Sequence, residues 1–280
     1  MIADRRDCVN ALISFGLSVM QACHLSGLSK ASYYRRSTSW RKRDAAVIDA
    51  LNCVLKQSPQ SGFWKCFGRI RRQGHSWNHK KVYRVYCLMG LNMPRRQKRA
   101  LPKRIAQPLK VVAQANHQWA LDFMSDSLYC GRRFRTLNIV DESTRECLDI
   151  EVDTSLPAER VVRVLDRLGQ QRDLPKQLRV DNGPELISTK LLDWCEEHEI
   201  EVLHIQPGKP QQNAFIERFN GSFRREVLNA YLFKNLAQVR EMAWLWRMDY
   251  NEQRPHESLG NLPPAIYRVK LENSNLDVSQ

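Results

Sequence analysis

The order in which apolar patterns follow one another between residues 119 and 251 most narrowly limits the fold of this chain. Three apolar stretches separated by short turns predict strands, and alternating helix and strand patterns follow them. The predicted strands are 119–124, 134–140, 146–152, 177–180 and 201–205, and the predicted helices are 161–168, 186–197 and 236–251. This order predicts an α/β fold with a mixed five-stranded sheet flanked by helices.

Residues 206–229 begin as a loop with two prolines and a glycine and continue as an amphipathic helix. One apolar helical face is predicted by residues spaced four apart, namely Phe215, Phe219, Phe223 and Val227. A neighbouring stripe is polar and consists of Asn213, Glu217, Asn220 and Arg224. This stripe is either a solvated surface or one wall of a metal site with a cation directed at phosphate.

Three carboxylates have positions that set them apart from the other acidic residues. Asp122 lies inside a predicted buried strand, where a charge is costly unless it is paired or binds metal. Asp181 directly follows the strand 177–180, and carboxylates at strand ends of open α/β sheets face the ligand crevice. Glu217 lies at the start of the amphipathic helix. We expect the three to converge, and oxygen ligands without His or Cys suit Mg²⁺ or Mn²⁺.

Other polar residues near these positions have simpler interpretations. Asp126 and Asp141 lie where strands end and are predicted to form turns or caps. Glu185 is predicted to be solvated or to support Asp181, and Glu226 points away from the face of Glu217. His256 is interpreted as a structural or DNA-contacting residue, since the carboxylates already suffice for metal.

The positive charge is concentrated in the first part of the chain. The formal net charge is +14, yet residues 1–110 hold 23 Lys and Arg against 4 Asp, whereas residues 111–280 hold 21 against 26 acidic residues. The strongly basic N-terminal part suggests that it binds a polyanion, and the slightly acidic C-terminal part suggests carboxylate-based chemistry there. Generic RNA-binding proteins share such basic regions, so charge alone does not identify the type of nucleic acid.

Residues 1–40 have the pattern of a helix-turn-helix module. Small Cys23 precedes a turn at 26–28, and Ser29 is placed to cap the helix 30–36. Three side chains of this second helix are predicted to contact DNA, namely Lys30, Tyr33 and Arg35. The simpler alternative is a small helical cap.

Residues 41–93 predict a second helical DNA-binding module with helices at 46–57, 62–72 and 80–89. Its last helix carries Lys80, Lys81 and Arg84, which form either a DNA-contacting surface or a solvated basic face. Residues 94–110 predict a basic linker able to lie along phosphates. The catalytic core is expected at 111–272 and a tail at 273–280.

The eight cysteines form no CxxC pair, which argues against a zinc ribbon and against a disulfide framework. Scattered thiols fit a reducing cytosol. No apolar run approaches the ~18 residues of a membrane span. We therefore expect a cytoplasmic protein without a membrane partner.

Four sequence blocks together carry a resemblance to a known family. They are WALDFMSDSLYCGRRFRTLNIVDESTRECL from residue 119, VDNGPELIS from 180, PGKPQQNAFIERFNGSFRREVLN from 207 and YNEQRPHESLGNLPPA from 250. Asp181 and Glu217 have 35 residues between them. Residues 116–270 resemble the catalytic core of bacterial insertion-sequence transposases of the class encoded by a second reading frame. They are also similar to retroviral integrases.

This resemblance implies a ribonuclease-H-like fold and phosphoryl transfer on DNA. Asp122, Asp181 and Glu217 would hold two divalent ions, and Arg224 would contact phosphate near the scissile bond. The implied partners are double-stranded DNA at element ends and target, further copies of the chain on DNA, and a first-frame protein joined by frameshift fusion. Further DNA contacts are expected from Asn213, Asn220 and Lys209. The alternatives are a structure-specific nuclease and a non-catalytic DNA-binding regulator or transposase remnant.

Overall fold

The computed structural model describes residues 2–34, 39–92, 114–206 and 210–277. The chain divides into two compact units, residues 1–52 and 53–280. The expected linker 94–110 lies outside the described residues, as do Arg35 and Lys209. The other domain boundaries expected from the sequence stay predictions.

The first unit contains the helices α1 (Ile2–Ser14), α2 (Val19–Leu25), α3 (Lys30–Tyr34) and α4 (Trp40–Arg43). Ser18 and Gln21 form a reciprocal capping box that starts α2. Gly27 has a φ of 62° in the turn after α2, a conformation that favours glycine. The hydroxyl of Ser29 accepts a hydrogen bond from the Ser32 N–H at 3.2 Å, as expected for a cap. A small core holds α1 to α3 together through Val9, Ala22, Cys23 and Leu28.

Helix α5 (Ala45–Gln57) spans the boundary between the units, and α6 (Phe63–Arg72) and α7 (His79–Leu88) follow it in the second unit. The Asn78 side chain caps α7 by accepting a hydrogen bond from the Lys80 N–H at 2.9 Å. Helix α7 buries Val82, Val85 and Tyr86. Its other side exposes Lys80, Lys81 and Arg84 together with Tyr83 and Leu88.

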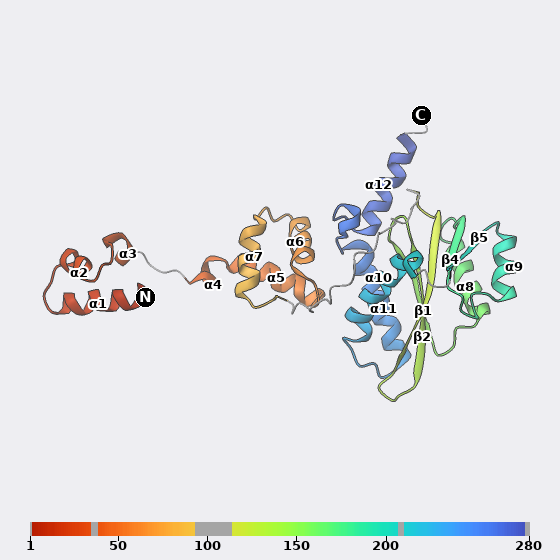
Figure 1. The fold of residues 1–280 in the computed structure, drawn as a ribbon, viewed down its shortest axis with the longest axis horizontal. Coiled ribbons are helices and arrows are strands. Elements are labelled where there is room, and N and C mark those ends of the chain that lie inside the picture. Colours follow the sequence, from red (N-terminus) through yellow and green to blue (C-terminus); the bar gives the residue numbers. More distant parts are fainter. Residues whose placement is uncertain (1, 35–38, 93–113, 207–209, 278–280) are drawn as a thin grey trace. The chain divides into compact units, whose positions relative to one another are not determined.

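A mixed five-stranded sheet forms the centre of the second unit, as predicted (Figure 1). The strands are β1 (Gln118–Ser127), β2 (Arg133–Asp141), β3 (Cys147–Asp153), β4 (Gln177–Val180) and β5 (Glu201–His204). Their order across the sheet is β3-β2-β1-β4-β5. The pairs β1–β2 and β2–β3 are antiparallel, whereas β1–β4 and β4–β5 are parallel. The helical segments between the parallel strands make these connections possible.

Helices cover both faces of the sheet. Helices α8 (Ala158–Gly169) and α9 (Thr189–Glu197) share one hydrophobic core with the sheet, which includes Leu121 of β1. Helices α10 (Ala214–Phe223) and α11 (Leu236–Glu252) share the other core, which includes Ala120. Adjacent residues of β1 thus belong to different cores, because side chains alternate along a strand.

Three short helical segments and a longer helix complete the second unit. They are the 3₁₀ turns at Pro210–Asn213 and Glu257–Leu259, the π-helical turn at Arg224–Leu228, and α12 (Pro264–Asp277). Helix α12 continues past residue 272, where the tail was expected to begin. Within the described residues, no helix is long and apolar enough to cross a membrane.

The apolar face expected for α10 needs one correction. Phe219, Phe223 and Val227 are buried, but Phe215 is half-buried and lies under the Arg145 guanidinium, 3.3 Å from its ring centroid. Ile216 is fully buried and takes the place expected for Phe215. The sheet therefore packs against a stripe that starts one residue later than predicted.

Candidate active site

The two predicted aspartates lie on neighbouring parts of the sheet. Asp122 on β1 pairs with Asn138 on β2, and Ala120 pairs with Arg179 on the parallel strand β4. Asp181 directly follows the last residue of β4. Ala120 packs in the core beneath α10, and side chains two residues apart share a face. Asp122 therefore lies on the side of the sheet that α10 covers, and Asp181 lies at the end of the strand beside it.

Hydrogen bonds from two directions hold the Asp122 carboxylate. Its Oδ1 accepts from the Phe123 N–H at 2.8 Å, and its Oδ2 accepts from the Asn220 side-chain amide at 2.8 Å. Asn220 is held in turn by the amide of Asn138, which donates to its Oδ1 at 2.6 Å. Asn138 and Asn220 are buried, so this chain of amides fixes the orientation of Asp122 against α10.

The electrostatic surroundings of Asp122 link it to the other two predicted carboxylates. The pKa of Asp122 is raised to about 6, mainly by burial, and the negative charges of Asp181 and Glu217 contribute in the same direction. The hydrogen bonds from Phe123 and Asn220 act in the opposite direction. Like charges near a partly buried carboxylate disfavour its ionised form, and a bound cation would relieve that repulsion.

Asp181 is positioned by the turn that follows β4. Its Oδ1 accepts a hydrogen bond from the Gly183 N–H at 2.9 Å, which folds the carboxylate back over the turn. A Cβ atom on residue 183 would lie 2.9 Å from that same oxygen. Glycine at this position therefore leaves room for the Asp181 carboxylate.

Glu217 lies in the first turn of α10, where the helix dipole favours an anion. The entrance to this helix is tied to β4, because the Arg179 guanidinium donates to the Gln212 carbonyl at 2.6 Å. The same guanidinium donates to Glu142 at 3.1 Å. Arg179 thereby couples the start of the helix that carries Glu217 to the strand that precedes Asp181.

The carboxylate oxygens of Asp122, Asp181 and Glu217 match a hard divalent cation in chemistry and charge. The three side chains do not, however, surround a single point. Within the described residues, no three His, Cys, Asp or Glu side chains form a group that could hold a metal ion as they stand. The three carboxylates supply only oxygen donors, and two of them raise the pKa of the third. Metal binding would require them to turn toward one another.

Two further residues of the predicted polar stripe have specific surroundings. Arg224 donates to the Ser125 carbonyl at 3.0 Å and lies 3.5 Å from the Asp126 carboxylate, with 40% of its side chain exposed. Asn213 is buried, and its Oδ1 has no hydrogen-bond donor among the described residues. Arg224 thus lies at the solvent-exposed end of β1. Asn213 lies one turn before Glu217, and its side-chain oxygen is able to accept a further hydrogen bond.

The predicted contacts of the helical modules are placed as follows. Lys30, Lys80, Lys81 and Arg84 are exposed on α3 and α7. Tyr33 is half-buried, packs against the small core of the first unit and donates its hydroxyl proton to Asn10 at 2.9 Å. The Tyr33 side chain therefore contributes to packing within the first helical module.

The alternative acidic residues are engaged elsewhere. Asp141 accepts hydrogen bonds from the N–H groups of Asn116, Ser143 and Thr144, which confirms its role as a turn former. Glu185 forms an ion pair with Arg135, and Glu226 binds Arg254 through both oxygens. These partners leave Asp122, Asp181 and Glu217 as the candidate set.

Sequence reasoning missed Asn138 and Arg179, which hold other site residues in place. Asn138 is a lone amide within the buried strand residues Leu137, Ile139 and Val140. A buried polar group in such a run needs a partner, and this signal could have identified it. Arg179 lies within a short strand and shows no comparable pattern.

Comparison with known proteins identifies the family of this chain. Two models described as integrase core domain match residues 112–210 and 198–264. Over 92% of its length the chain is 39% identical to a protein of insertion element IS476 from Xanthomonas euvesicatoria, covering 75% of that protein. It is 37% identical to a protein of insertion element IS407 from Burkholderia multivorans, with 91% of each chain covered.

A more distant relative is the transposase InsD of insertion element IS2 from Escherichia coli, which is 25% identical over 93% of this chain and 94% of its own length. The HTLV-2 integrase catalytic core domain, solved with magnesium, shows a weak likeness with a TM-score of 0.45, 18% identity, and coverage of 55% of this chain and 97% of that one. The fold and sequence define an integrase-core protein. The chain belongs to the family of bacterial insertion-element transposases.

Proposed function

We propose that this transposase cuts phosphodiester bonds at the ends of its element and joins the resulting 3′-OH to target DNA. In this proposal Asp122, Asp181 and Glu217 bind two divalent ions, Mg²⁺ or Mn²⁺. The observation that carries it is the raised pKa of Asp122, to which the carboxylates of Asp181 and Glu217 contribute across three different elements. Carboxylates with pKa values perturbed by burial and by neighbouring charge are typical of functional sites.

When bound, the ions would activate the attacking water or 3′-OH and neutralise charge on the leaving oxygen. The protein's own groups prepare the site for this chemistry. Asn220 and Asn138 hold Asp122 in one orientation, and the Gly183 N–H does the same for Asp181. Preorganised ligands of this kind reduce the reorganisation that the reaction requires.

Two side chains of the polar stripe are suited to binding DNA. Arg224 is in part exposed beside the end of β1, and its weak 3.5 Å contact with Asp126 leaves the guanidinium able to bind a phosphate. The unpartnered Oδ1 of Asn213 can accept a hydrogen bond from water or from a nucleotide. The exposed cations of α3 and α7 would add contacts to the phosphate backbone at the element ends.

The first prediction concerns the three carboxylates. Asp122→Asn, Asp181→Asn and Glu217→Gln should each lower strand transfer by at least about 10³-fold, because each removes a charged metal ligand. Binding of element-end DNA should persist. Strand transfer is measured with a labelled element-end duplex and a target plasmid in Mg²⁺.

Glu241→Gln is the matched control, because Glu241 is an exposed acidic residue on α11 outside the site. It should retain full activity. Strand transfer retained by any one of the three site variants would remove that residue from the proposed metal site.

The reaction products also separate the competing functions. A transposase gives covalently joined products, a structure-specific nuclease gives only nicked or cut DNA, and a non-catalytic regulator gives neither. The proposal includes assembly of further copies of the chain on DNA and fusion to a first-frame protein. Comparing the single-frame chain with a frame-fused chain in the same assay tests the fusion.

A further inference from the structure

A cavity of about 700 Å³ lies on the side of α10 that faces away from Asp122. Its walls come from α6, α10, the β2–β3 turn and the segment after α11, all within the second unit. Arg218 and Arg225 line it from α10 and the turn that follows, seven residues apart and so on one helical face. Glu217 is not among the lining residues. Helix α10 therefore separates this cavity from the candidate active site.

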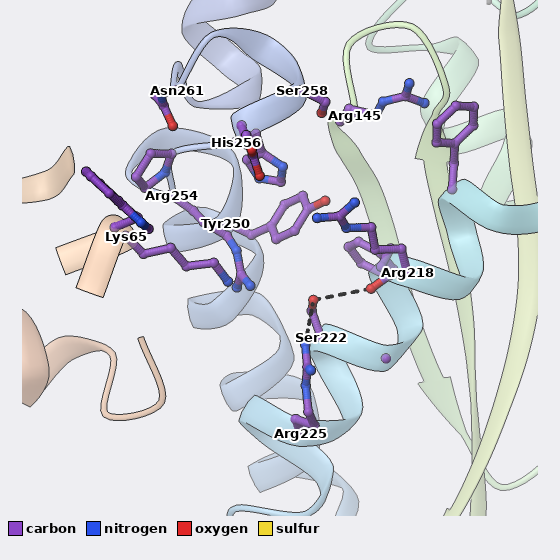
Figure 2. A pocket seen from close by; sticks show the side chains of 16 residues that line it. Lys65, Arg145, Arg218, Ser222, Arg225, Tyr250, Arg254, His256, Ser258 and Asn261 are labelled. Carbon is purple, nitrogen blue, oxygen red and sulfur yellow. Dashed lines mark hydrogen bonds between the residues drawn. The ribbon is translucent and has the colours of Figure 1, made fainter. Parts of the chain in front are cut away.

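Positive charge dominates this cavity (Figure 2). Its lining carries the cations Lys65, Arg145, Arg218, Arg225 and Arg254 against a single carboxylate, that of Glu257. Glu226 binds Arg254 through both oxygens and also lies 3.8 Å from the Lys65 ammonium. The remaining cations are held together by the fold without an equal number of acids, so the cavity attracts anions.

The cationic side chain of Arg145 is fixed in place at the wall of the cavity. Arg145 has a φ of 61°, an unfavourable conformation for a residue with a side chain, and its guanidinium stacks on Phe215. The loop thus holds a cation in place at a conformational cost.

Aromatic rings accompany the cations. Trp64 lines the cavity and is 66% exposed. Tyr250 also lines it and lies beside Arg218 (Figure 2). Trp64 also lines a second cavity of about 420 Å³ together with Phe63, His79, Lys80, Tyr83 and Arg84. Exposed rings next to cations form a typical surface for unpaired nucleotides, with bases stacked and phosphates paired.

We propose that this cavity binds an unpaired segment of a DNA strand, with its phosphates on Arg218 and Arg225 and a base stacked on Trp64. A volume of this size encloses a ligand of one or two nucleotides, whereas a duplex is too wide to enter. Glu217 and Arg218 are consecutive, so the cavity lies about 10 Å across one helix from the active site. This inference rests on the proposed function, which makes DNA the substrate.

The position of the cavity gives the bound strand a role in the reaction. A strand held there would continue from the DNA end that lies at the carboxylates, once the end has been unpaired for cutting. Binding would then favour the opened end over intact duplex, as expected when a site holds a reaction intermediate.

The test uses the full chain and a fluorescein-labelled oligothymidylate of about 12 nucleotides, a length within the range that single-strand sites cover. Binding is followed by fluorescence anisotropy over a series of salt concentrations. The double variant Arg218→Gln, Arg225→Gln should bind about tenfold more weakly, and the slope of log affinity against log salt should fall by about 1.4, or 0.7 for each lost phosphate contact. Trp64→Ala should also weaken binding about tenfold.

The matched control is the double variant Arg132→Gln, Arg133→Gln, which removes the same charge from exposed residues at the β1–β2 turn outside the cavity. It should change affinity less than about twofold. Equal losses in the two double variants would overturn the proposal, because general electrostatic attraction would then explain the binding. Circular dichroism checks that each variant is folded.

Two further measurements separate the possible ligands and the two proposals. Cross-links from an iodouridine-substituted oligothymidylate should map to Trp64 or Tyr250, and cross-links only to other regions would contradict the inference. Displacement by thymidine monophosphate at equal nucleotide concentration would assign the cavity to free nucleotides instead of a strand. The oligothymidylate assay requires neither divalent ions nor strand transfer, so failure of the catalytic proposal is detected independently by the strand-transfer assay.

Discussion

At the scale of single residues, small groups with fixed positions determine how the candidate carboxylates are held. Asp122 depends on the amide of Asn220, and Asn220 depends on the amide of Asn138. Asp181 depends on a backbone N–H and on the absence of a side chain at Gly183. A metal site built from few ligands is sensitive to such supports, because displacements below 1 Å change the ligand geometry.

Gly183→Ala should therefore lower strand transfer while leaving the fold intact. The added Cβ would lie 2.9 Å from the Asp181 Oδ1, and the carboxylate can move away because it ends a flexible side chain. We expect a loss of about tenfold in strand transfer and a change in unfolding free energy below about 1 kcal/mol.

Gly62→Ala provides the control for this substitution, since a Cβ at residue 62 meets nothing within 4 Å. Strand-transfer rates and urea denaturation compare the two variants. A Gly183→Ala protein with unchanged activity would show that the Asp181 carboxylate does not need this space.

At the scale of elements, the junction between α10 and α11 is held by a buried ion pair. The π-helical turn Arg224–Leu228 ends α10 and carries Glu226, which accepts hydrogen bonds from Arg254 and from the Trp246 indole at 2.9 Å. His256 follows in the next segment, where burial and the cations around it lower its pKa to about 3. The His256 imidazole is therefore neutral in the folded chain near neutral pH, and its protonation makes the stability of this segment depend on pH.

The contribution of His256 to the stability of the second unit should fall as the pH falls below 6.5. His256 takes up a proton near pH 6.5 in the unfolded chain, but in the folded chain only near pH 3, so the unfolded state binds more protons between these values. Its contribution is present above pH 6.5 and is lost progressively below it. Between pH 8 and pH 5 we expect a loss of about 2 kcal/mol from this residue.

Urea denaturation of the wild type and of His256→Gln at both pH values measures this contribution, because the variant retains every other titrating group. The wild type should lose more stability than the variant as the pH falls. Equal losses in the two proteins would show that His256 is protonated equally in the folded and unfolded chains.

At the scale of the whole molecule, the second unit joins a helical module to the integrase-type core through charged contacts. Arg69 of α6 binds both carboxylate oxygens of Asp249 on α11, at 2.7 and 2.5 Å. Only 6% of the Arg69 side chain is exposed. Gly68 allows this approach, because a Cβ there would lie 2.9 Å from Pro255. Residues far apart in the sequence thus form one compact unit.

Asp249→Asn should destabilise the second unit by about 2–4 kcal/mol, because it leaves the buried Arg69 guanidinium without its counter-charge. Glu159→Gln is the matched control, since Glu159 and Lys190 form an ion pair in which both side chains are more than half exposed. The control should lose less than about 1 kcal/mol. Urea denaturation measures both. Equal effects would mean that the Arg69–Asp249 pair is effectively solvated.

Much of this architecture could be predicted from the sequence because its signals are local. Apolar stretches bounded by turns identified all five strands. β4 has its predicted bounds, β1 and β2 are longer, β3 is shifted by one residue and β5 ends one residue earlier. The cap at Ser29 was predicted from a side chain that bonds a backbone group three residues away. The three carboxylates were selected by their positions in strands and at the start of a helix, and their metal role stays a prediction.

Contacts between distant residues could not be predicted in this way. Phe215 was assigned to the buried face by its spacing, yet packing against Arg145 turned it outward and left Ile216 inside. Asn138 binds Asn220 across 82 positions of the sequence, and Arg69 binds Asp249 across 180. Such pairs leave no periodic pattern, because each depends on how whole elements pack.

The sequence by itself determined the integrase-type order of strands and helices, the division of charge and the identity of the candidate carboxylates. These follow from periodicity, composition and motif spacing, which act over a few residues or describe the chain as a whole. Only the tertiary structure decided how Asp122 is held, where Arg224 and Glu226 find their partners, and that a cationic cavity lies behind α10. Burial and pairing at these places depend on elements brought together by hydrophobic packing, which acts without regard to their separation in the chain.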